Sequence, residues 1–482
     1  MKAMVYTEYG PPDVVLELQE VEKPTPKENE VLVQVCAASV NYCDWSFVRG
    51  KPFIVRPAYQ GLFKPKNTIL GADIAGRVEA VGANVTQFQP GDEVFGEIGS
   101  CGLGGFAEYV AVPEDALALK PANLTFEGAA AVSGETIERS YKRSNDGCFA
   151  CPVRCSRQIR VDDPRYADLA MEGPEYEPLA GFTARVGVTD LPLALHAVDR
   201  CNRLGLDAIT TSEVIAWSME LTQCGLLSRD EAHGLDLRFG AGESVLALIE
   251  AIATREGLGD LLAGGVRAAA ERLGRGAEIA MHVKGLELFQ ADVRAMKGYA
   301  LGNAVSSRGA DHLRSEPWFE FSGDETTARS RFGDAAASHR LAWKGKGRLV
   351  ACFEEMAAVC DALGMCKNLY NNMGVLDWDE TAEILSAVVG GRWSGEDVQQ
   401  VGERIVNLER ELNRTWGIDR RDDTLPARFL REPAGPADSP SSGSIVELAQ
   451  MLDEYYQARG WDRDTGLPTR EKLQALGLEV SD

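Results

Sequence analysis

The sequence predicts a multidomain α+β protein in which a β-rich N-terminal part is followed by two mainly α-helical domains. The chain has 482 residues, and domains of roughly 100–200 residues leave room for about three. Hydrophobic residues make up 45% of the chain and charged residues 26%, as is ordinary for a globular protein with a sizeable core. Apolar residues follow a strand-like pattern up to residue 132 and a helical one afterwards, so we expect a domain boundary there.

Short strands are expected in residues 1–132. Three valines occupy alternate positions of 31–35, as in a strand with one buried face. A second β-prone run covers 74–81 and ends in a Gly-Ala-Asn turn at 82–84, and a third run follows a Gln-Pro-Gly-Asp turn at 93–95. Turn residues between such runs predict a β-rich domain.

Helices are expected in the rest of the chain. Apolar residues within 245–252 share one helical face, and Gly257 is the expected stop. A second apolar face runs over 262–273 and is ended by Gly274. The pattern Ser394-x-x-Asp397 predicts the start of a long helix.

The expected domains are residues 1–132, 133–281 and 282–482. The sequence contains no internal repeat with a fixed period. The Pro/Gly/Ser-rich stretch 431–444 has little tendency to form a helix and is expected to be a loop.

The net negative charge of the chain limits the kinds of molecule that it is expected to bind. Lys and Arg number 50 against 73 Asp and Glu, which gives a formal net charge of -23. Such a field repels phosphate backbones, so we expect no nucleic-acid partner. No apolar run approaches the ~18 residues of a membrane span, and the opening MKAMVYTEYG is too polar for a secretory signal. We therefore expect a cytoplasmic protein with reduced thiols.

The strongest chemical signal is the group Cys148, Cys151 and Cys155. Three thiolates from one short loop can bind one side of an iron–sulfur cluster whose fourth ligand comes from elsewhere in the fold. Cys366 is the preferred fourth ligand. Its rivals are Cys201, Cys224, Cys352 and Cys360. A zinc site and a set of core thiols are the alternatives, although the Cys-x-x-x-Cys spacing fits structural zinc poorly.

A series of segments after residue 132 matches one known family. These segments are SGETIERSY (133–141), CFACPVRC (148–155), EGPEYEPL (172–179), CNRLGLDAITTSEVIAWSMEL (201–221), HVKGLEL (282–288), RGADHLR (308–314), DALGMC (361–366), DDTLPARF (422–429) and LDEYYQARGWDRDTGLPTREKLQALGL (452–478). Residues 133–482 thereby resemble the two C-terminal domains of the tungsten-pterin aldehyde ferredoxin oxidoreductase family.

This resemblance implies two cofactors, a [4Fe–4S] cluster and a tungstopterin or molybdopterin. The implied cluster ligands are Cys148, Cys151, Cys155 and Cys366. Two pterin-binding segments of the form Asp-x-x-Gly-Leu-Asp/Cys are also implied, the first with Asn in place of the usual Asp. Their residues are Asn202, Gly205, Leu206 and Asp207, then Asp361, Gly364 and Met365. Glycine lets a backbone approach a flat heterocycle closely, and a carboxylate accepts from its N–H donors.

The resemblance also implies the catalytic residues Glu177 and His312. A glutamate suits the role of base, and a histidine suits hydrogen bonding or proton transfer near neutral pH. Glu172 and Glu175 lie beside Glu177, and the residues alone do not choose among the three. The implied reaction oxidises aldehydes to carboxylates, with ferredoxin or a similar small carrier as electron acceptor. A homo-oligomer is compatible with the resemblance.

The N-terminal part resembles a different family. The segments VLVQVCAASVNYCDW (31–45), GADIAGRVEAVGANVTQFQPGDEVFG (71–96) and GGFAEYVAVPEDALALKP (104–121) resemble the GroES-like barrel of zinc-less medium-chain dehydrogenase/reductases. No strand–GxGxxG–helix unit follows residue 132. The alternative functions are therefore an NADPH-dependent quinone oxidoreductase, and an inactive or cluster-only fusion without the domain that forms the floor beneath the pterin.

Overall fold

The structure of the chain is a computed structural model in which two compact units are distinguished. It describes every residue except 40–41, 50–62, 86, 99–101, 120–136, 138–139, 150, 152, 167–168, 373, 375, 436–440 and 479–482. One unit comprises Met1–Pro174, Thr189–His196 and Gly435–Ser442, and the other Glu175–Val188, Ala197–Ala434 and Gly443–Asp482. The expected boundary at 132/133 lies outside the described residues, and the limits of the three domains stay predictions.

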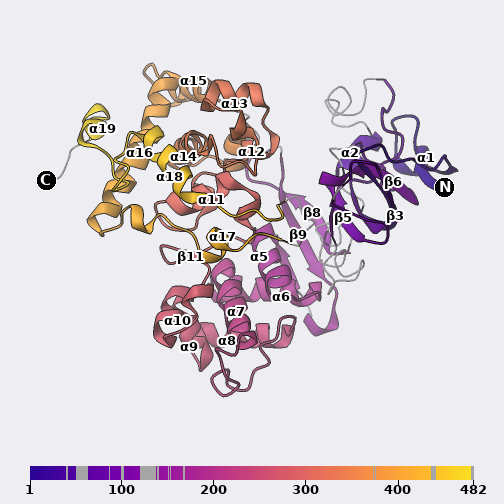
Figure 1. Cartoon of the computed structure of the whole chain (residues 1–482), viewed down its shortest axis with the longest axis horizontal. Helices are drawn as coiled ribbons and strands as arrows, with labels where there is room; N and C mark the ends of the chain where they lie inside the picture. Colours follow the sequence, from indigo (N-terminus) through magenta and orange to yellow (C-terminus); the bar gives the residue numbers. More distant parts are fainter. Residues whose placement is uncertain are drawn as a thin grey trace. The chain divides into compact units, whose positions relative to one another are not determined.

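Antiparallel strands dominate the N-terminal part of the first unit (Figure 1). Its elements are β1 (Lys2–Val5), α1 (Pro12–Val15), β2 (Glu17–Glu20), β3 (Glu30–Ser39), α2 (Tyr42–Arg49), β4 (Asp73–Val81), β5 (Glu93–Glu97), β6 (Tyr109–Pro113) and β7 (Ala118–Leu119). A five-stranded sheet has the order β6-β3-β4-β5-β7, and β1 pairs with β2. Among the described strands, β6 and β7 do not pair with each other, so the closed barrel that we expected is not shown.

The three strands predicted in this part are confirmed as β3, β4 and β5. Val31 and Val33 are fully buried in the core of the sheet, as their alternation predicts. Leu32 is buried as well, so β3 is covered on both faces at that point. Gly82 ends β4 where an added Cβ would lie 1.9 Å from the carbonyl oxygen of Lys27, which leaves no room for a side chain.

A three-stranded antiparallel sheet follows, with the order β10-β9-β8. Its strands are β8 (Lys142–Asp146), β9 (Ser156–Val161) and β10 (Leu169–Glu172). The prediction that the chain turns helical after residue 132 is therefore wrong for 142–172. The physical reason is that β8 is polar and mostly exposed, so it lacks the apolar alternation by which a strand is detected.

Most of the remaining elements are helices, mainly in the second unit (Figure 1). They are α5 (Tyr176–Ala180), α6 (Leu191–Leu204), α7 (Ala208–Gln223), α8 (Gly242–Thr254), α9 (Leu258–Leu262), α10 (Gly265–Leu273), α11 (Lys297–Val305), α12 (Phe319–Ser322), α13 (Glu325–Phe332), α14 (Lys346–Leu363), α15 (Trp378–Val389), α16 (Gly395–Thr415), α17 (Ala427–Arg431), α18 (Leu448–Arg459) and α19 (Arg470–Ala475). A short hairpin, β11 (His282–Val283) and β12 (Leu286–Glu287), lies between α10 and α11.

The predicted helix signals are confirmed in part. Ser394 and Asp397 form a reciprocal capping box at the start of α16, and Gly274 adopts a left-handed conformation at the end of α10. The helix over 245–252 is α8, but it ends at Arg255, whose φ is 56°. Gly257 instead precedes α9, because an Arg already supplies the left-handed cap.

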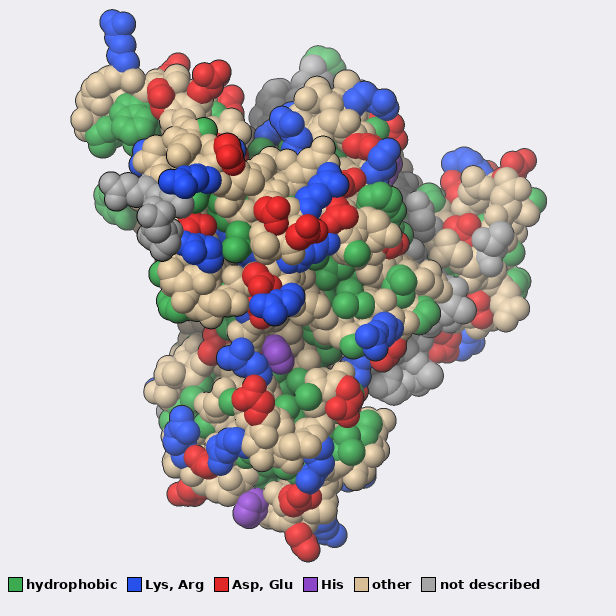
Figure 2. Space-filling view, turned by 60° about the vertical axis from the view of Figure 1, so that its left-hand side comes forward, with side chains coloured by type: hydrophobic (Ala, Val, Ile, Leu, Met, Phe, Trp, Pro, Cys, Tyr) green, Lys and Arg blue, Asp and Glu red, His purple; other side chains and the backbone are tan. Residues whose placement is uncertain are grey.

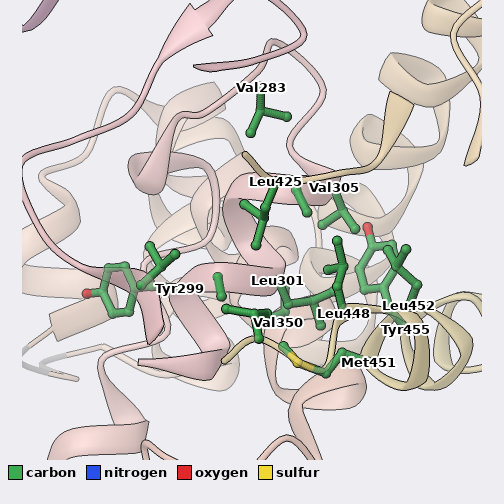
Figure 3. Close-up of a cluster of buried hydrophobic side chains, with 14 of the residues drawn as sticks. Val283, Tyr299, Leu301, Val305, Val350, Leu425, Leu448, Met451, Leu452 and Tyr455 are labelled. Carbon is green, nitrogen blue, oxygen red and sulfur yellow. The ribbon is translucent and has the colours of Figure 1, made fainter. Parts of the chain in front are cut away.

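A large hydrophobic core of the second unit lies where α11, α14 and α18 meet (Figure 3). Leu301, Val350 and Met451 come from these three helices and are fully buried, each contributing about 1.5–3 kcal/mol by leaving water. Arg459 is buried beside them, and its guanidinium lies 2.7 Å from both Glu354 and Glu355. The buried cation is thus paired on both sides, as its burial requires.

The surface carries charges of both signs. Acidic and basic side chains are interleaved over the face drawn in Figure 2, although the chain is acidic overall. Among the helices that the structure describes, none combines the length and the apolar composition that crossing a bilayer requires.

Candidate functional site

The three cysteines predicted to bind a cluster lie on the loop that joins β8 to β9. Asn145 Nδ2 donates a hydrogen bond to the carbonyl oxygen of Arg154 over 3.2 Å, and Arg154 Nη2 donates to the carbonyl oxygen of Asn145 over 2.7 Å. Arg154 holds a left-handed φ of 49°, which helps to turn the chain back. One loop closed at its base therefore carries Cys148, Cys151 and Cys155.

The chemistry of this donor set fits an iron–sulfur cluster. Cys148 and Cys155 are exposed and Cys151 is half-buried in the first unit, and Cys366 is exposed in the second, so each thiol is open to solvent in its own unit. Within the part of the chain that the structure describes, no group of three or more His, Cys, Asp or Glu is arranged to hold a metal ion. Joint ligation by the four cysteines stays a prediction.

Three of the rival cysteines have the properties of core thiols. Burial raises the pKa of the Cys201 thiol to about 12 and the pKa values of Cys352 and Cys360 to about 11. A thiol must ionise to ligate iron, and burial opposes this. Cys224 is exposed and stays a rival of Cys366.

The first predicted pterin segment is the C-terminal cap of α6. Gly205 has a φ of 70°, and its N–H donates to the carbonyl oxygen of Asn202. The next N–H, of Leu206, donates to the carbonyl oxygen of Cys201 over 2.9 Å. These two bonds define a Schellman cap, in which a left-handed glycine lets the last helical carbonyls find donors.

The second predicted segment repeats this structure at the end of α14. Gly364 has a φ of 65°, its N–H donates to the carbonyl oxygen of Asp361, and the N–H of Met365 donates to that of Cys360 over 2.9 Å. The two segments therefore share one backbone motif, although they lie on different helices.

The carboxylates of the two segments already have partners. Asp207 accepts a hydrogen bond from the Thr210 N–H over 2.7 Å and caps α7. Asp361 lies 3.0 Å from Arg314 Nη1 and 3.0 Å from Lys367 Nζ. A pterin that binds here would meet one carboxylate engaged by a backbone amide and one held between two cations.

Glu177, the predicted base, lies in the first turn of α5 and is half-buried. Its Oε2 accepts a hydrogen bond from the backbone N–H of Gln290 over 2.5 Å. Burial raises the pKa of Glu177, against the lowering effects of that hydrogen bond and of Arg185. Glu172 and Glu175 are both exposed, so Glu177 is the member of this acidic group whose environment suits a base.

His312, the predicted partner in proton transfer, lies in a one-turn 3-10 helix, His312–Arg314. Its ring stacks on Phe289, with 4.6 Å between the ring centroids. Burial is the largest effect on the pKa of His312 and lowers it; Asp311 acts in the opposite direction, and Lys367 lowers the pKa as well. The imidazole is therefore neutral at neutral pH and can accept a proton.

The two predicted catalytic residues contact two adjacent residues of one segment. Glu177 binds the backbone of Gln290, and His312 stacks on Phe289. The second pterin segment is linked to the residue after His312, because Lys367 Nζ, which pairs with Asp361, also donates to the carbonyl oxygen of Leu313 over 2.6 Å. The fold thus connects the predicted catalytic residues to segments that are far apart in the sequence.

Sequence reasoning missed Arg185 and Gln290. Arg185 Nε donates to Gln290 Oε1 over 2.9 Å and lies 3.0 Å from Glu213 Oε2. Within the described part of the chain Glu213 Oε2 accepts no hydrogen bond, and burial raises the pKa of Glu213 to about 7. Arg185 follows the matching segment 172–179, and Gln290 follows the matching segment 282–288. Closeness to these segments was the signal that could have indicated both residues.

Comparison with known proteins identifies the family. The family model described as aldehyde ferredoxin oxidoreductase, domains 2 and 3, matches residues 95–478. The chain belongs to the aldehyde ferredoxin oxidoreductase family. A second model, the alcohol dehydrogenase GroES-like domain, matches residues 27–122, so this family member carries a GroES-like N-terminal part.

Similar proteins agree with this assignment. The tungsten-containing aldehyde ferredoxin oxidoreductase of Thermococcus kodakarensis is 36% identical over 355 residues, which are 73% of this chain and 56% of that protein. The protein of the same name from Pyrococcus furiosus is 36% identical over 348 residues, or 72% of this chain and 54% of that one. The 2-methylene-furan-3-one reductase of Solanum lycopersicum is 39% identical over 148 residues, or 30% of this chain and 36% of that one.

This family member spans just over half the length of the tungsten-containing relatives it matches. Among solved structures, the active site complex BamBC of benzoyl coenzyme A reductase superposes with a TM-score of 0.60 and 21% identity, covering 74% of this chain and 56% of that one. At that identity the likeness shows a shared fold.

Proposed function

We propose that this chain oxidises an aldehyde to a carboxylate and that the electrons leave through a [4Fe–4S] cluster to ferredoxin or a similar small carrier. The overall change is RCHO + H₂O → RCOO⁻ + 3 H⁺ + 2 e⁻. A bound tungstopterin, or its molybdenum counterpart, would supply the two-electron acceptor. The observation that supports the proposal is that Glu177 and His312 contact two adjacent residues, Gln290 and Phe289.

Glu177 is proposed to take the proton that water loses when it adds to the aldehyde. The backbone N–H of Gln290 fixes Oε2, and among the described residues Oε1 has no hydrogen-bond donor, so Oε1 is the oxygen that can receive a proton. Because burial raises the pKa of this carboxyl, the proton is held more firmly than on an exposed glutamate.

His312 is proposed to bind the substrate oxygen or pass on a second proton. Stacking on Phe289 limits rotation of the imidazole. Because burial lowers the pKa of His312, the neutral ring offers one donor and one acceptor nitrogen. Arg314, two residues further along, ties this turn to Asp361.

The cofactors would be held by residues already described. Cys148, Cys151, Cys155 and Cys366 would bind the cluster, and the glycine-capped segments that end in Asp207 and Cys366 would hold the pterin. Gly205 and Gly364 leave open space where a Cβ would be, with no heavy atom within 4 Å. A flat ring could therefore approach the backbone at both glycines.

Elemental analysis of the anaerobically purified full chain tests the proposal. Iron, acid-labile sulfide and tungsten or molybdenum should all be present, with aldehyde-dependent reduction of a viologen dye. Iron and sulfide without tungsten or molybdenum would instead indicate a cluster-only fusion. NADPH-dependent quinone reduction would contradict the proposal, and the sheets of the described residues are antiparallel throughout, unlike a nucleotide-binding Rossmann sheet.

Substitution of the base gives a sharper test. Glu177→Gln should lower kcat for aldehyde oxidation by about a hundredfold or more, because a general base typically contributes 10²–10⁴. Glu175→Gln is the matched control, since that exposed side chain lies two positions away. The visible spectrum of the cluster should be the same in both variants. Equal turnover by the two variants would remove Glu177 from the mechanism.

A further inference from the structure

A cavity of about 320 Å³ lies in the second unit next to Gln290. Its lining comes from the end of α5 and the π-helical turn Gly181–Arg185 that follows, from residues 281–294 and from α17. The lining residues are Ala180, Ala184, Arg185, Met281, Gln290, Ala291, Asp292, Arg294, Arg428 and Phe429. Cavities of about 300 Å³ and more are of the size that binds small molecules.

Two donor groups on the wall of this cavity lack acceptors. Gln290 Nε2 is buried and, among the described residues, has no hydrogen-bond partner. Arg185 uses Nε for both Gln290 and Glu213, and within the described residues its Nη1 and Nη2 make no hydrogen bond. Buried donors are nearly always paired in native proteins, so Gln290 Nε2 indicates a ligand that brings an acceptor. The Arg185 side chain is 26% exposed, so a ligand can reach its Nη1 and Nη2.

The other two arginines on the wall are already engaged. Arg294 lies 2.6 Å from Asp292 Oδ2 and donates to the carbonyl oxygens of Glu432 and Pro433. Arg428 pairs with Glu220. Arg185 is therefore the guanidinium with an unused face, and its planar fork matches a carboxylate.

The remaining wall suits a short carbon chain. Ala180, Ala184, Met281 and Phe429 supply apolar surface around the donors. Among the described lining residues the one acidic side chain, Asp292, is paired with Arg294. Glu213, which shares Arg185, has a pKa raised by burial to about 7, so its negative charge is incomplete at neutral pH and opposes an anion less.

We propose that this cavity binds a small carboxylate, held by Arg185 Nη1 and Nη2 and by Gln290 Nε2. The backbone of Gln290 binds Glu177 while its side chain borders the cavity. If the proposed function holds, on which this further step rests, the carboxylate is either the distal group of an aldehyde substrate or that of the acid product.

Calorimetry with the full chain tests the site directly. Butanoate should bind with a Kd on the order of 1 mM, as expected for about six non-hydrogen atoms at a moderate ligand efficiency. Butanamide, which has the same shape without the charge, should bind about tenfold more weakly or worse. Equal affinity for the two compounds, or no saturable binding of butanoate, would overturn the proposal.

Three variants test whether the forked guanidinium of Arg185, and not its positive charge alone, binds the carboxylate. Arg185→Lys keeps the charge but loses the fork, and Gln290→Leu loses the amide; each should weaken butanoate binding about tenfold. Arg294→Lys is the matched control on the same wall, and the Kd should stay within about threefold, because its fork already binds protein atoms. Unchanged Kd values in both Arg185→Lys and Gln290→Leu would contradict the proposal.

Turnover assays distinguish the two sources of the carboxylate. A distal substrate carboxylate predicts that the ratio of kcat/KM for 4-oxobutanoate to that for butanal falls about tenfold in Arg185→Lys. A product carboxylate predicts an unchanged ratio and weaker competitive inhibition of butanal oxidation by butanoate. Failure to oxidise either aldehyde, with butanoate binding intact, would reject the proposed function and leave the site standing.

Discussion

The caps of α6 and α14 have the same backbone and different side chains. Both end in a left-handed glycine followed by a hydrogen bond back to a buried cysteine carbonyl. At the position three before the glycine, one segment has Asn202 and the other Asp361. At the position two after the glycine, one has Asp207 and the other Cys366.

This comparison separates what shapes the segment from what gives it chemistry. The glycine and the helix end fix the backbone, because the left-handed conformation satisfies the last carbonyls in both cases. The variable positions then set charge and ligand type. Asp361 is held between Arg314 and Lys367, whereas the Asn202 side chain makes no hydrogen bond within the described residues.

The largest expected difference between the segments concerns Cys366 and Asp207. Cys366→Ser should abolish stoichiometric iron in the anaerobically purified protein, because a serine hydroxyl is a poor substitute for a thiolate ligand. Asp207→Asn should keep the iron, since Asn can still cap α7. Iron and acid-labile sulfide assays on both variants check this prediction.

Cys360→Ser provides the internal control for that experiment. Cys360 is buried and its thiol donates to the carbonyl oxygen of Met365 over 3.0 Å, so the variant should retain iron and lose some stability. Loss of iron in Cys360→Ser with full iron in Cys366→Ser would contradict the prediction and indicate that Cys360 is the fourth cluster ligand.

Local signals allowed much of the fold to be predicted. The capping box at Ser394 and the glycine stop at Gly274 depend on neighbouring residues only, and both are confirmed. The strands over 142–172 were missed, because β8 owes its place to pairing with β9 rather than to its own apolar pattern. A signal that exists only after pairing cannot be read from one strand.

The residues of the candidate site were likewise predicted only in part. Motifs in the sequence indicated Glu177 and His312, but the contact of Glu177 with Gln290 joins positions 113 residues apart. Arg185 was missed because its partner Gln290 lies 105 residues away and neither belongs to a recognisable motif. Such contacts follow from tertiary packing, which spacing along the chain does not encode.

A second, smaller effect tests whether the two backbones are equivalent. Gly205→Ala and Gly364→Ala should each destabilise the protein by about 1–2 kcal/mol, the usual cost of a side chain in the left-handed region. No heavy atom lies within 4 Å of either added Cβ, so a clash contributes nothing. The shift in urea midpoint, followed by tryptophan fluorescence, checks this. A cost confined to one glycine would show that the two caps are not equivalent.

The smallest effect concerns charge at the position three before the glycine. Asp361→Asn removes the pairs with Arg314 and Lys367, but the Asp361 side chain is 41% exposed, so solvent screening limits the loss to under about 1 kcal/mol. Asn202→Asp adds an anion at the C-terminal end of α6, which is unfavourable by about 0.3–1 kcal/mol. Because ions screen exposed charges, both changes should shrink in urea titrations repeated at high salt. A stabilising Asn202→Asp would mean that the first cap holds a cation partner too, and the contrast between the two segments would then be lost.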